Sequence, residues 1–500
     1  MPCTTLLVGK DASFDGSTII ARNEDSGNGT FNPKRFVVVN PEDQPHTYKS
    51  VLAHLTIDLP DNPLRYTAVP NAVTNEGIWA EAGVNEENIS MSATETLTTN
   101  ERVLGADPFV TYEPEKGKPG DDGYEPELIG GIGEEDMVTI VLPYIHSARE
   151  GVLRLGKLLE QYGTYEMNGI AFSDVKEIWW LETVGGHHWI AKRVPDNMYV
   201  TMPNQLGIDS FDFEDAFGER KNYMCSVDMK QFVADNHLDL TLEGHAFNPR
   251  EAFGSHSDSD HVYNTPRAWA MQRFLNPHAI QWDASDALLT PESDDIPWGR
   301  VPERKVTIED VKYALSLHYQ GTRYDPYGRD GVATRGMYRP IGINRNSQLS
   351  VVEIRPDVDD RYAAIQWLAF GSNVFNALVP FYANVTTTPE YLSNTTAQVT
   401  TESFYWANRI IAGLADAHFH ECQAGIERYQ EKMGGIGHQI IHETDADAAA
   451  DQQVADVKPL LEAGNQKVAD YLKRETDSLL SKVLYEASMG MKNGFSKDDM

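Results

Sequence analysis

Strand-like segments dominate the first and middle parts of this chain, and helix-like segments lie between them and at its end. This order predicts antiparallel sheets layered with helices rather than alternating strand–helix units. Strands are expected at 3–9, 17–25, 35–39, 51–57 and 65–70, as a pair around a turn at 85–88 within 77–96, and as groups of three in 168–194 and 348–385.

Helices are expected where apolar residues recur about every 3.6 positions. The segment 137–163 has this spacing and is broken at Pro143. In 307–319, Thr307 is the expected N-cap, with Asp310 at the third helical position. From 402 onward the pattern is helical, and an apolar stripe runs through 457–484. Residues 207–300 are expected to be irregular.

The first two strands should form a hairpin, because Asp-Gly turn chemistry in "KDASFDGS" separates "CTTLLVG" from "STIIARNED". A hairpin centred near residues 12–13 would place Cys3 opposite Arg22 or Asn23. The loop length leaves this register open by a residue or two.

Charge and cysteine content exclude several classes of protein. The formal net charge is −33, which disfavours binding to nucleic acid or to an anionic membrane surface. Three cysteines form no disulfide framework and fit a reducing compartment. The sequence contains no 18-residue apolar run and no signal peptide at its start. We therefore expect a cytoplasmic protein that spans no membrane.

Most recognisable motifs are absent. The chain has neither a P-loop nor a G-x-S-x-G elbow. The segment "HSDSDH" (256–261) is more typical of a solvated acidic loop than of a metal site. His187 and His188 are more often structural than catalytic in such a setting. Cys225 and Cys422 are expected to be packed thiols.

Cys3 is chemically distinctive because it lies two residues from the start of the chain. If Met1 and Pro2 were removed, its α-amine, with a pKa of about 7.7–8.0, could act as base for its own thiol. The alternative is a small buried hydrophobic residue at the start of a strand. Arg22 could lower the thiol pKa, and Asp25 could orient an ammonium group or a thiol proton, although a salt bridge at a strand end is a common alternative.

The stretch "CTTLLVGKDASFDGSTIIARNEDS" resembles the N-terminus of the C69 dipeptidases, a branch of the N-terminal nucleophile (Ntn) hydrolases. Residues 177–205 and 263–274 are similar to further stretches of that family. The resemblance implies an α+β fold: a four-layer αββα sandwich of two antiparallel sheets between helices, with a helical C-terminal extension. The implied divisions are 1–2 as a removable propeptide, 3–400 as the catalytic domain and 401–500 as the extension.

The resemblance also implies functional residues. Cys3 matches the nucleophile, and Arg22 and Asp25 match a supporting Arg-x-x-Asp element. Asn204 is the counterpart of an asparagine that helps to bind the oxyanion, and Arg267 that of an arginine near the nucleophile. In the related bile-salt hydrolases and penicillin V acylases a second oxyanion asparagine would fall near Glu95. Here Asn85 or a backbone N–H would have to replace it.

The implied activity is hydrolysis of dipeptides by a cysteine nucleophile, with no metal or cofactor. Met1 and Pro2 depart from the mature family pattern, so the Pro2–Cys3 bond would have to be cut. The alternatives are an amidase for N-acyl substrates such as penicillin V or conjugated bile acids, and a non-catalytic regulatory protein like the secernins. Dipeptides are the expected partners, and the sequence leaves a homo-oligomer open.

Overall fold

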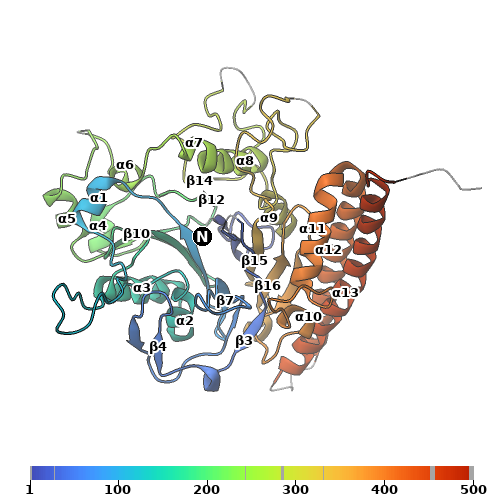
Figure 1. Cartoon of the computed structure of the whole chain (residues 1–500), viewed down its shortest axis with the longest axis horizontal. Helices are drawn as coiled ribbons and strands as arrows, with labels where there is room; N and C mark the ends of the chain where they lie inside the picture. Colours follow the sequence, from blue (N-terminus) through green and yellow to red (C-terminus); the bar gives the residue numbers. More distant parts are fainter. Residues whose placement is uncertain are drawn as a thin grey trace, which may run out of the picture.

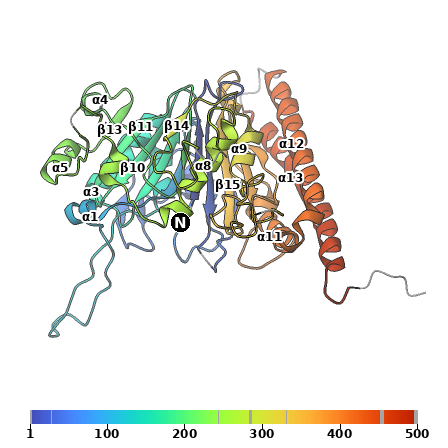
Figure 2. The same ribbon diagram turned by 90° about the horizontal axis from the view of Figure 1, so that it is seen from above.

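Two large antiparallel sheets lie face to face, with helices on their outer sides (Figures 1 and 2). The computed structural model describes residues 3–27, 29–242, 244–282, 287–329, 331–450 and 456–494. Contacts between β1 and β8 and between β2 and β9 join the two sheets directly. This arrangement confirms the predicted sandwich of antiparallel sheets between helices.

The first sheet has seven strands and brings together segments that lie far apart in the sequence. In spatial order they are β14 (Gly299–Arg300), β12 (Tyr199–Met202), β1 (Cys3–Val8), β2 (Thr18–Asp25), β15 (Asn346–Ile354), β16 (Ala364–Phe370) and β17 (Val379–Tyr382). The strand that begins with Cys3 is therefore an interior strand, flanked by β12 and β2.

The second sheet has six strands, and two further pairs of short strands lie outside both large sheets. The six are β13 (Tyr223–Cys225), β11 (His188–Arg193), β10 (Ile178–Val184), β9 (Asn168–Ser173), β8 (Ser90–Thr96) and β7 (Ala82–Val84). The pairs are β3 (Val37–Val39) with β6 (Tyr66–Ala68), and β4 (Thr47–Lys49) with β5 (Thr56–Asp58). The prediction of one strand over 51–57 is wrong, because His54 has φ +58° and the chain reverses between β4 and β5.

Alternation of side chains along β1 decides which residues face the second sheet. Leu6 and Val8 pack into the core on the outer face, whereas Leu7 packs into the core between the sheets. Because side chains two residues apart share a face, Cys3 and Thr5 point with Leu7 toward the second sheet, and Thr4 points the other way.

The outer face of the six-stranded sheet is covered by α2 (Met137–Val141) and α3 (Ala148–Tyr162). A short 3-10 turn, η2 (Leu142–Tyr144), separates them. Pro143 lies in this turn, so the predicted break in the helix is confirmed. Apolar side chains of both helices form one core with inward residues of β9 and β10.

The seven-stranded sheet is covered by the C-terminal helices α11 (Phe404–Ala415), α12 (Phe419–Ala450) and α13 (Lys458–Met489). These helices form the orange and red layer of Figures 1 and 2. The predicted stripe on α13 is largely buried, as at Leu461, Leu472 and Leu479, whereas Leu484 is exposed. A helical stripe pressed against a sheet is the usual means of burying such a face.

The region 207–300 is less irregular than predicted. It contains α4 (Phe213–Phe217), α5 (Met229–Asp235), α6 (Pro249–Phe253), α7 (Asp260–Tyr263) and α8 (Thr265–Leu275). Nine residues of α8 are buried, including polar ones, so the helix has no one-sided apolar stripe to reveal it. The remaining helices are α1 (Glu101–Ala106), α9 (Ile308–Ala314), α10 (Glu390–Ser393), η1 (Pro41–Asp43), η3 (Asp360–Tyr362) and η4 (Asp416–His418).

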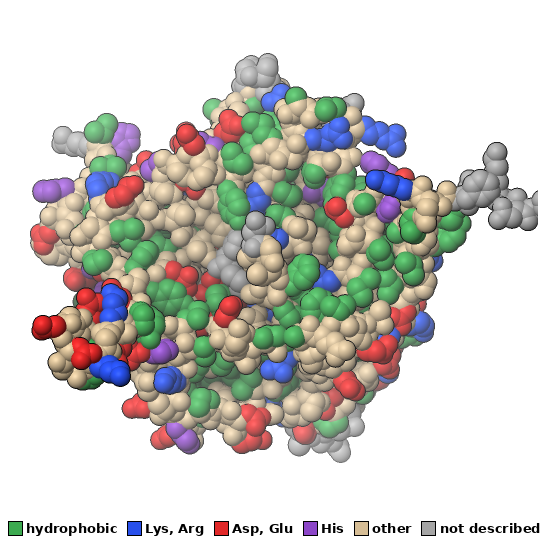
Figure 3. All heavy atoms as spheres, viewed as in Figure 1, with side chains coloured by type: hydrophobic (Ala, Val, Ile, Leu, Met, Phe, Trp, Pro, Cys, Tyr) green, Lys and Arg blue, Asp and Glu red, His purple; other side chains and the backbone are tan. Residues whose placement is uncertain are grey.

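The start of α9 confirms the predicted cap. Thr307 Oγ1 accepts from Asp310 N, and the Asp310 carboxylate accepts from Thr307 N. None of the helices within the described residues is long and apolar enough to cross a lipid bilayer. Acidic side chains are spread over the face shown in Figure 3, in keeping with the net charge of −33.

Candidate active site

Cys3 is the first residue of β1, and its side chain is fully buried between the sheets. Its Cα partner on β2 is Glu24, and Arg22 lies opposite Thr5. The register is therefore shifted from the predicted pairing with Arg22 or Asn23. Arg22 nevertheless reaches the thiol diagonally, because its Nη1 donates to Cys3 Sγ at 3.2 Å.

The guanidinium of Arg22 is held rigidly from several sides. Nε donates to Ser92 Oγ at 3.0 Å, and Nη2 donates to the carbonyl of Ala93 at 2.6 Å. Nη2 also donates to the carbonyl of Glu81 at 3.0 Å and forms an ion pair with its carboxylate. A fixed cation thus lies beside the thiol. Burial raises the pKa of Cys3 well above its usual value, and Arg22 opposes this increase.

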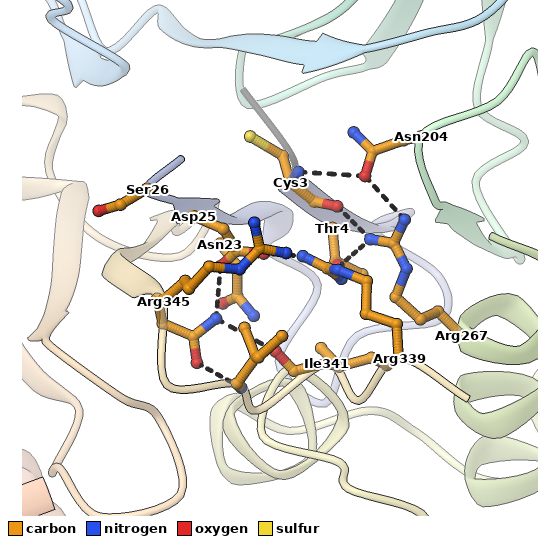
Figure 4. A network of polar contacts seen from close by, with 12 residues as sticks. Cys3, Thr4, Asn23, Asp25, Ser26, Asn204, Arg267, Arg339, Ile341 and Arg345 are labelled. Carbon is orange, nitrogen blue, oxygen red and sulfur yellow. Dashed lines mark hydrogen bonds and ion pairs between the residues drawn. The ribbon is translucent and has the colours of Figure 1, made fainter. Parts of the chain in front are cut away.

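The backbone of Cys3 is bound by two side chains on the other side (Figure 4). Cys3 N donates to Asn204 Oδ1 at 3.3 Å. Arg267, on α8, donates through Nη1 to the Cys3 carbonyl and through Nη2 to Asn204 Oδ1, the latter at 2.7 Å. Arg267 also binds Thr4 Oγ1 at 2.7 Å. Both the nitrogen and the carbonyl of Cys3 are therefore fixed.

Asp25 lies at the end of β2 and forms a different contact from the one expected. Its carboxylate forms an ion pair with Arg339 and accepts from Asn346 Nδ2 at 2.5 Å. Arg339 and Arg267 both lie over the ring of Tyr263, at 4.7 and 5.2 Å from its centroid. Burial, and then the nearby Arg339, lower the pKa of Arg267 to about 10. Asp25 thus holds a second arginine next to the one that binds Cys3.

Glu95 is a buried acid on β8 that sequence reasoning located but gave no role. Thr5 Oγ1 donates to its Oε2 at 2.8 Å. Burial raises its pKa to about 8, against the opposing charges of Arg267 and Arg22. Asn85, offered as a replacement oxyanion donor, lies elsewhere: its Nδ2 donates to the carbonyls of Leu142 and Ile145, at 3.1 and 2.8 Å.

The segment considered as a metal site and the two histidines considered as catalytic residues form hydrogen bonds within the fold. In 256–261, Asp260 accepts from Ser257 Oγ at 2.8 Å and from Asn264 Nδ2 at 2.5 Å. Asn264 Oδ1 in turn accepts from Arg267 at 2.9 Å, so this loop supports the arginine beside Cys3. His187 and His188 both bind the carboxylate of Asp107, at 3.0 and 2.7 Å.

Five site residues were predicted from the sequence. Direct contacts bring together Cys3, Arg22, Asn204 and Arg267. These contacts do not join the fifth residue, Asp25, to Cys3. Sequence reasoning missed the residues that hold them, above all Glu81 and Arg339. Both are buried charged side chains paired with an opposite charge. A buried charge needs such a partner, but sequence separation hid the pairing.

Comparison with known proteins identifies a family and several relatives. The model of peptidase family C69 matches residues 2–432. A protein of Bifidobacterium longum (strain NCC 2705) named dipeptidase is 63% identical to the chain, with 100% of both chains covered. A probable dipeptidase A of Streptococcus pyogenes serotype M3 (strain SSI-1) is 54% identical, also over 100% of both. Dipeptidase A of Lactobacillus helveticus is 44% identical, over 97% of this chain and 96% of that protein.

Proposed function

The chain belongs to peptidase family C69, and on that premise we propose that it is a dipeptidase whose nucleophile is the thiol of Cys3. The observation that carries the proposal is the double contact at this residue. Arg22 Nη1 lies 3.2 Å from Sγ, and Asn204 Oδ1 lies 3.3 Å from the backbone nitrogen. A nucleophile and its own nitrogen are thus both oriented by fixed polar groups.

The mechanism requires that Met1 and Pro2 be removed, so that Cys3 N becomes a free α-amine. Both residues lie outside the described part of the chain. We propose 1–2 as this removable segment, 3–400 as the catalytic domain and 401–500 as a helical extension. After cleavage Asn204 Oδ1 would accept a hydrogen bond from the new amine and keep it beside the thiol. Nucleophile and base would then be one residue.

The reaction begins when the α-amine takes the thiol proton. The thiolate attacks the peptide carbonyl carbon, and the carbonyl oxygen becomes an oxyanion. The ammonium then gives its proton to the leaving amino group as the C–N bond breaks. Water, deprotonated by the α-amine, hydrolyses the thioester that remains and restores the thiol. Arg22 favours the thiolate throughout by its positive charge.

Asn204 is the proposed oxyanion donor. Its Nδ2 carries two hydrogens, and one of them is directed to the carbonyl of Thr96 at 2.9 Å. The other can be donated to the developing oxyanion. One such donor contributes about 2.7–4 kcal/mol to transition-state stabilisation in acyl-transfer enzymes. Arg267 and Asp25 have positioning roles: Arg267 fixes Asn204, and Asp25 fixes Arg339 next to it.

The experiment that tests this function compares Cys3→Ala and Cys3→Ser with the unaltered chain on a panel of dipeptides and N-acyl amides. We expect dipeptide hydrolysis by the unaltered chain, none by Cys3→Ala and a small residual rate with Cys3→Ser. Cys225→Ala is the matched control, since Cys225 is also a buried thiol. Hydrolysis of N-acyl amides with no activity on dipeptides would favour the amidase alternative.

A further inference from the structure

We propose that Glu95 binds the α-ammonium group of the dipeptide and so selects substrates with a free N-terminus. This inference rests on the proposed function. The carboxyl is completely buried, and Thr5 Oγ1 binds only one of its oxygens, Oε2, at 2.8 Å. Within the described residues, the other oxygen, Oε1, has no hydrogen-bond partner. A buried carboxyl oxygen without a partner is costly, which indicates that a ligand supplies one.

The position of Glu95 follows from the strands around Cys3. Thr5 lies two residues after Cys3 on β1, so their side chains share a face and are separated by about 7 Å along the strand. Because Thr5 binds Glu95 directly, the carboxyl lies next to the nucleophile on this face.

Hydrogen bonds to β8 on both sides of Glu95 further define its position relative to Cys3. Arg22, which binds Cys3 Sγ, donates to the carbonyl of Ala93 at 2.6 Å. Asn204, which binds Cys3 N, donates to the carbonyl of Thr96 at 2.9 Å. Glu95 lies between these two points on β8. The two side chains that bind Cys3 therefore also bind the backbone of β8 on either side of Glu95.

The geometry of a dipeptide requires a negatively charged partner for its α-ammonium group close to Cys3. Its α-nitrogen is two bonds from the carbonyl carbon that Cys3 attacks, a separation of about 2.5 Å. The ammonium group must therefore enter the buried space beside Sγ, where a cation needs a carboxylate partner. Glu95 and Glu134 are the two carboxyls whose charges raise the pKa of the Cys3 thiol most strongly. Of these, Glu95 is the one that accepts a hydrogen bond from Thr5, two residues after Cys3 on the same strand.

A bound ammonium group would also change the ionisation of Glu95 in this buried site. Burial raises the pKa of this carboxyl to about 8, so its ionised form is disfavoured there. A cation at Oε1 would favour the ionised form. An N-acylated substrate carries no charge at this position and could not favour the ionised form of Glu95.

The test measures kcat and KM for alanyl-alanine and for N-acetyl-alanyl-alanine with Glu95→Gln. We expect kcat/KM for the free dipeptide to fall about 100-fold, mainly through KM, because truncating one member of a buried charge pair has an effect of this size. The rate with the N-acetyl substrate should stay unchanged or rise. Glu353→Gln is the matched control, since Glu353 is a buried acid of β15 bound by Trp367 Nε1 at 2.9 Å. It should change neither rate.

Glu95→Asp provides a second variant that keeps the charge on a shorter side chain. It should retain the preference for the free dipeptide, with a higher KM than the unaltered enzyme. The inference is overturned if Glu95→Gln keeps the original KM for the free dipeptide, or if it loses activity on both substrates by the same factor. Failure of the unaltered enzyme to hydrolyse any dipeptide would instead overturn the proposed function, and this inference with it.

Discussion

Arg22 and Cys3 are diagonal neighbours on adjacent antiparallel strands, and Arg22 Nη1 donates to Cys3 Sγ at 3.2 Å. The same guanidinium is fixed by the carbonyls of Ala93 and Glu81 and by Ser92. Arg22 is therefore a preorganised positive charge at the thiol. It offsets part of the burial that raises the thiol pKa.

Replacing Arg22 by lysine should lower kcat about 100-fold, since a lysine cannot reproduce the fork of donors that fixes the charge. The thiol pKa should rise, so the midpoint of iodoacetamide alkylation against pH should move upward. Arg355→Lys, at an ion pair with Asp445, is the control. An Arg22→Lys enzyme with an unaltered alkylation curve and unaltered kcat would refute this role.

The Asp25–Arg339 ion pair should be strongly coupled, because both side chains are buried. Asp25→Asn alone leaves the guanidinium without its carboxylate and should cost about 3–5 kcal/mol in the free energy of unfolding. The double variant Asp25→Asn/Arg339→Met should lose less than the sum of the single variants. Urea unfolding of the four proteins measures this coupling. Additivity within about 0.5 kcal/mol would show that the pair is not coupled.

Glu95 should make stability depend on pH. Its pKa in the folded protein is about 8, above the usual carboxyl value of 4.5, so the folded state holds the proton more tightly than the unfolded state. The free energy of unfolding should therefore decrease as pH rises from 4.5 to 8, by up to about 1.4 kcal/mol per pH unit. Glu95→Gln should weaken the pH dependence of stability without abolishing it, because burial also raises the pKa of Glu24 to about 8 and that of Glu182 to about 7. The variant should be more stable than the unaltered chain at pH 8. If the free energy of unfolding changed with pH equally in Glu95→Gln and in the unaltered chain, this expectation would be contradicted.

The packing of α12 on β17 should depend on Gly437. A Cβ atom at this position would lie 2.6 Å from Pro380 Cδ, so Gly437→Ala should lower the free energy of unfolding by about 1–3 kcal/mol. Gly434→Ala on the same helix is the matched control. Among the described residues, no atom outside the helix's own backbone lies within 4 Å of its Cβ position, and alanine should stabilise the helix by up to about 1 kcal/mol there. Equal effects at both sites would argue against this contact.

Much of the fold could be predicted because its signals are local. Short apolar runs bounded by turn residues located β1 and β2, and the spacing of apolar residues located α13. The register between β1 and β2 differs by one residue from the predicted pairing with Asn23, within the margin left open, because residues 9–17 form a long connection rather than a tight turn. α8 was missed because buried polar residues such as Arg267 and Gln272 hide its periodicity.

The site could be predicted only where its residues lie in recognisable stretches. Cys3, Arg22 and Asp25 belong to one such stretch, and Asn204 and Arg267 to two others. The partner of Asp25 could not be predicted, because Arg339 is 314 positions away in the sequence. The orientation of Asn204, with its oxygen toward Cys3 N, depends on Arg267 and is likewise a property of the folded chain.

The most direct test of the central claim is the intact mass of the purified active enzyme, measured beside its dipeptidase activity. We predict a chain that begins at Cys3, and dipeptidase activity that increases in proportion to the fraction lacking Met1 and Pro2. Full dipeptidase activity in a chain that retains Pro2 would contradict the proposal that the α-amine of Cys3 is the catalytic base.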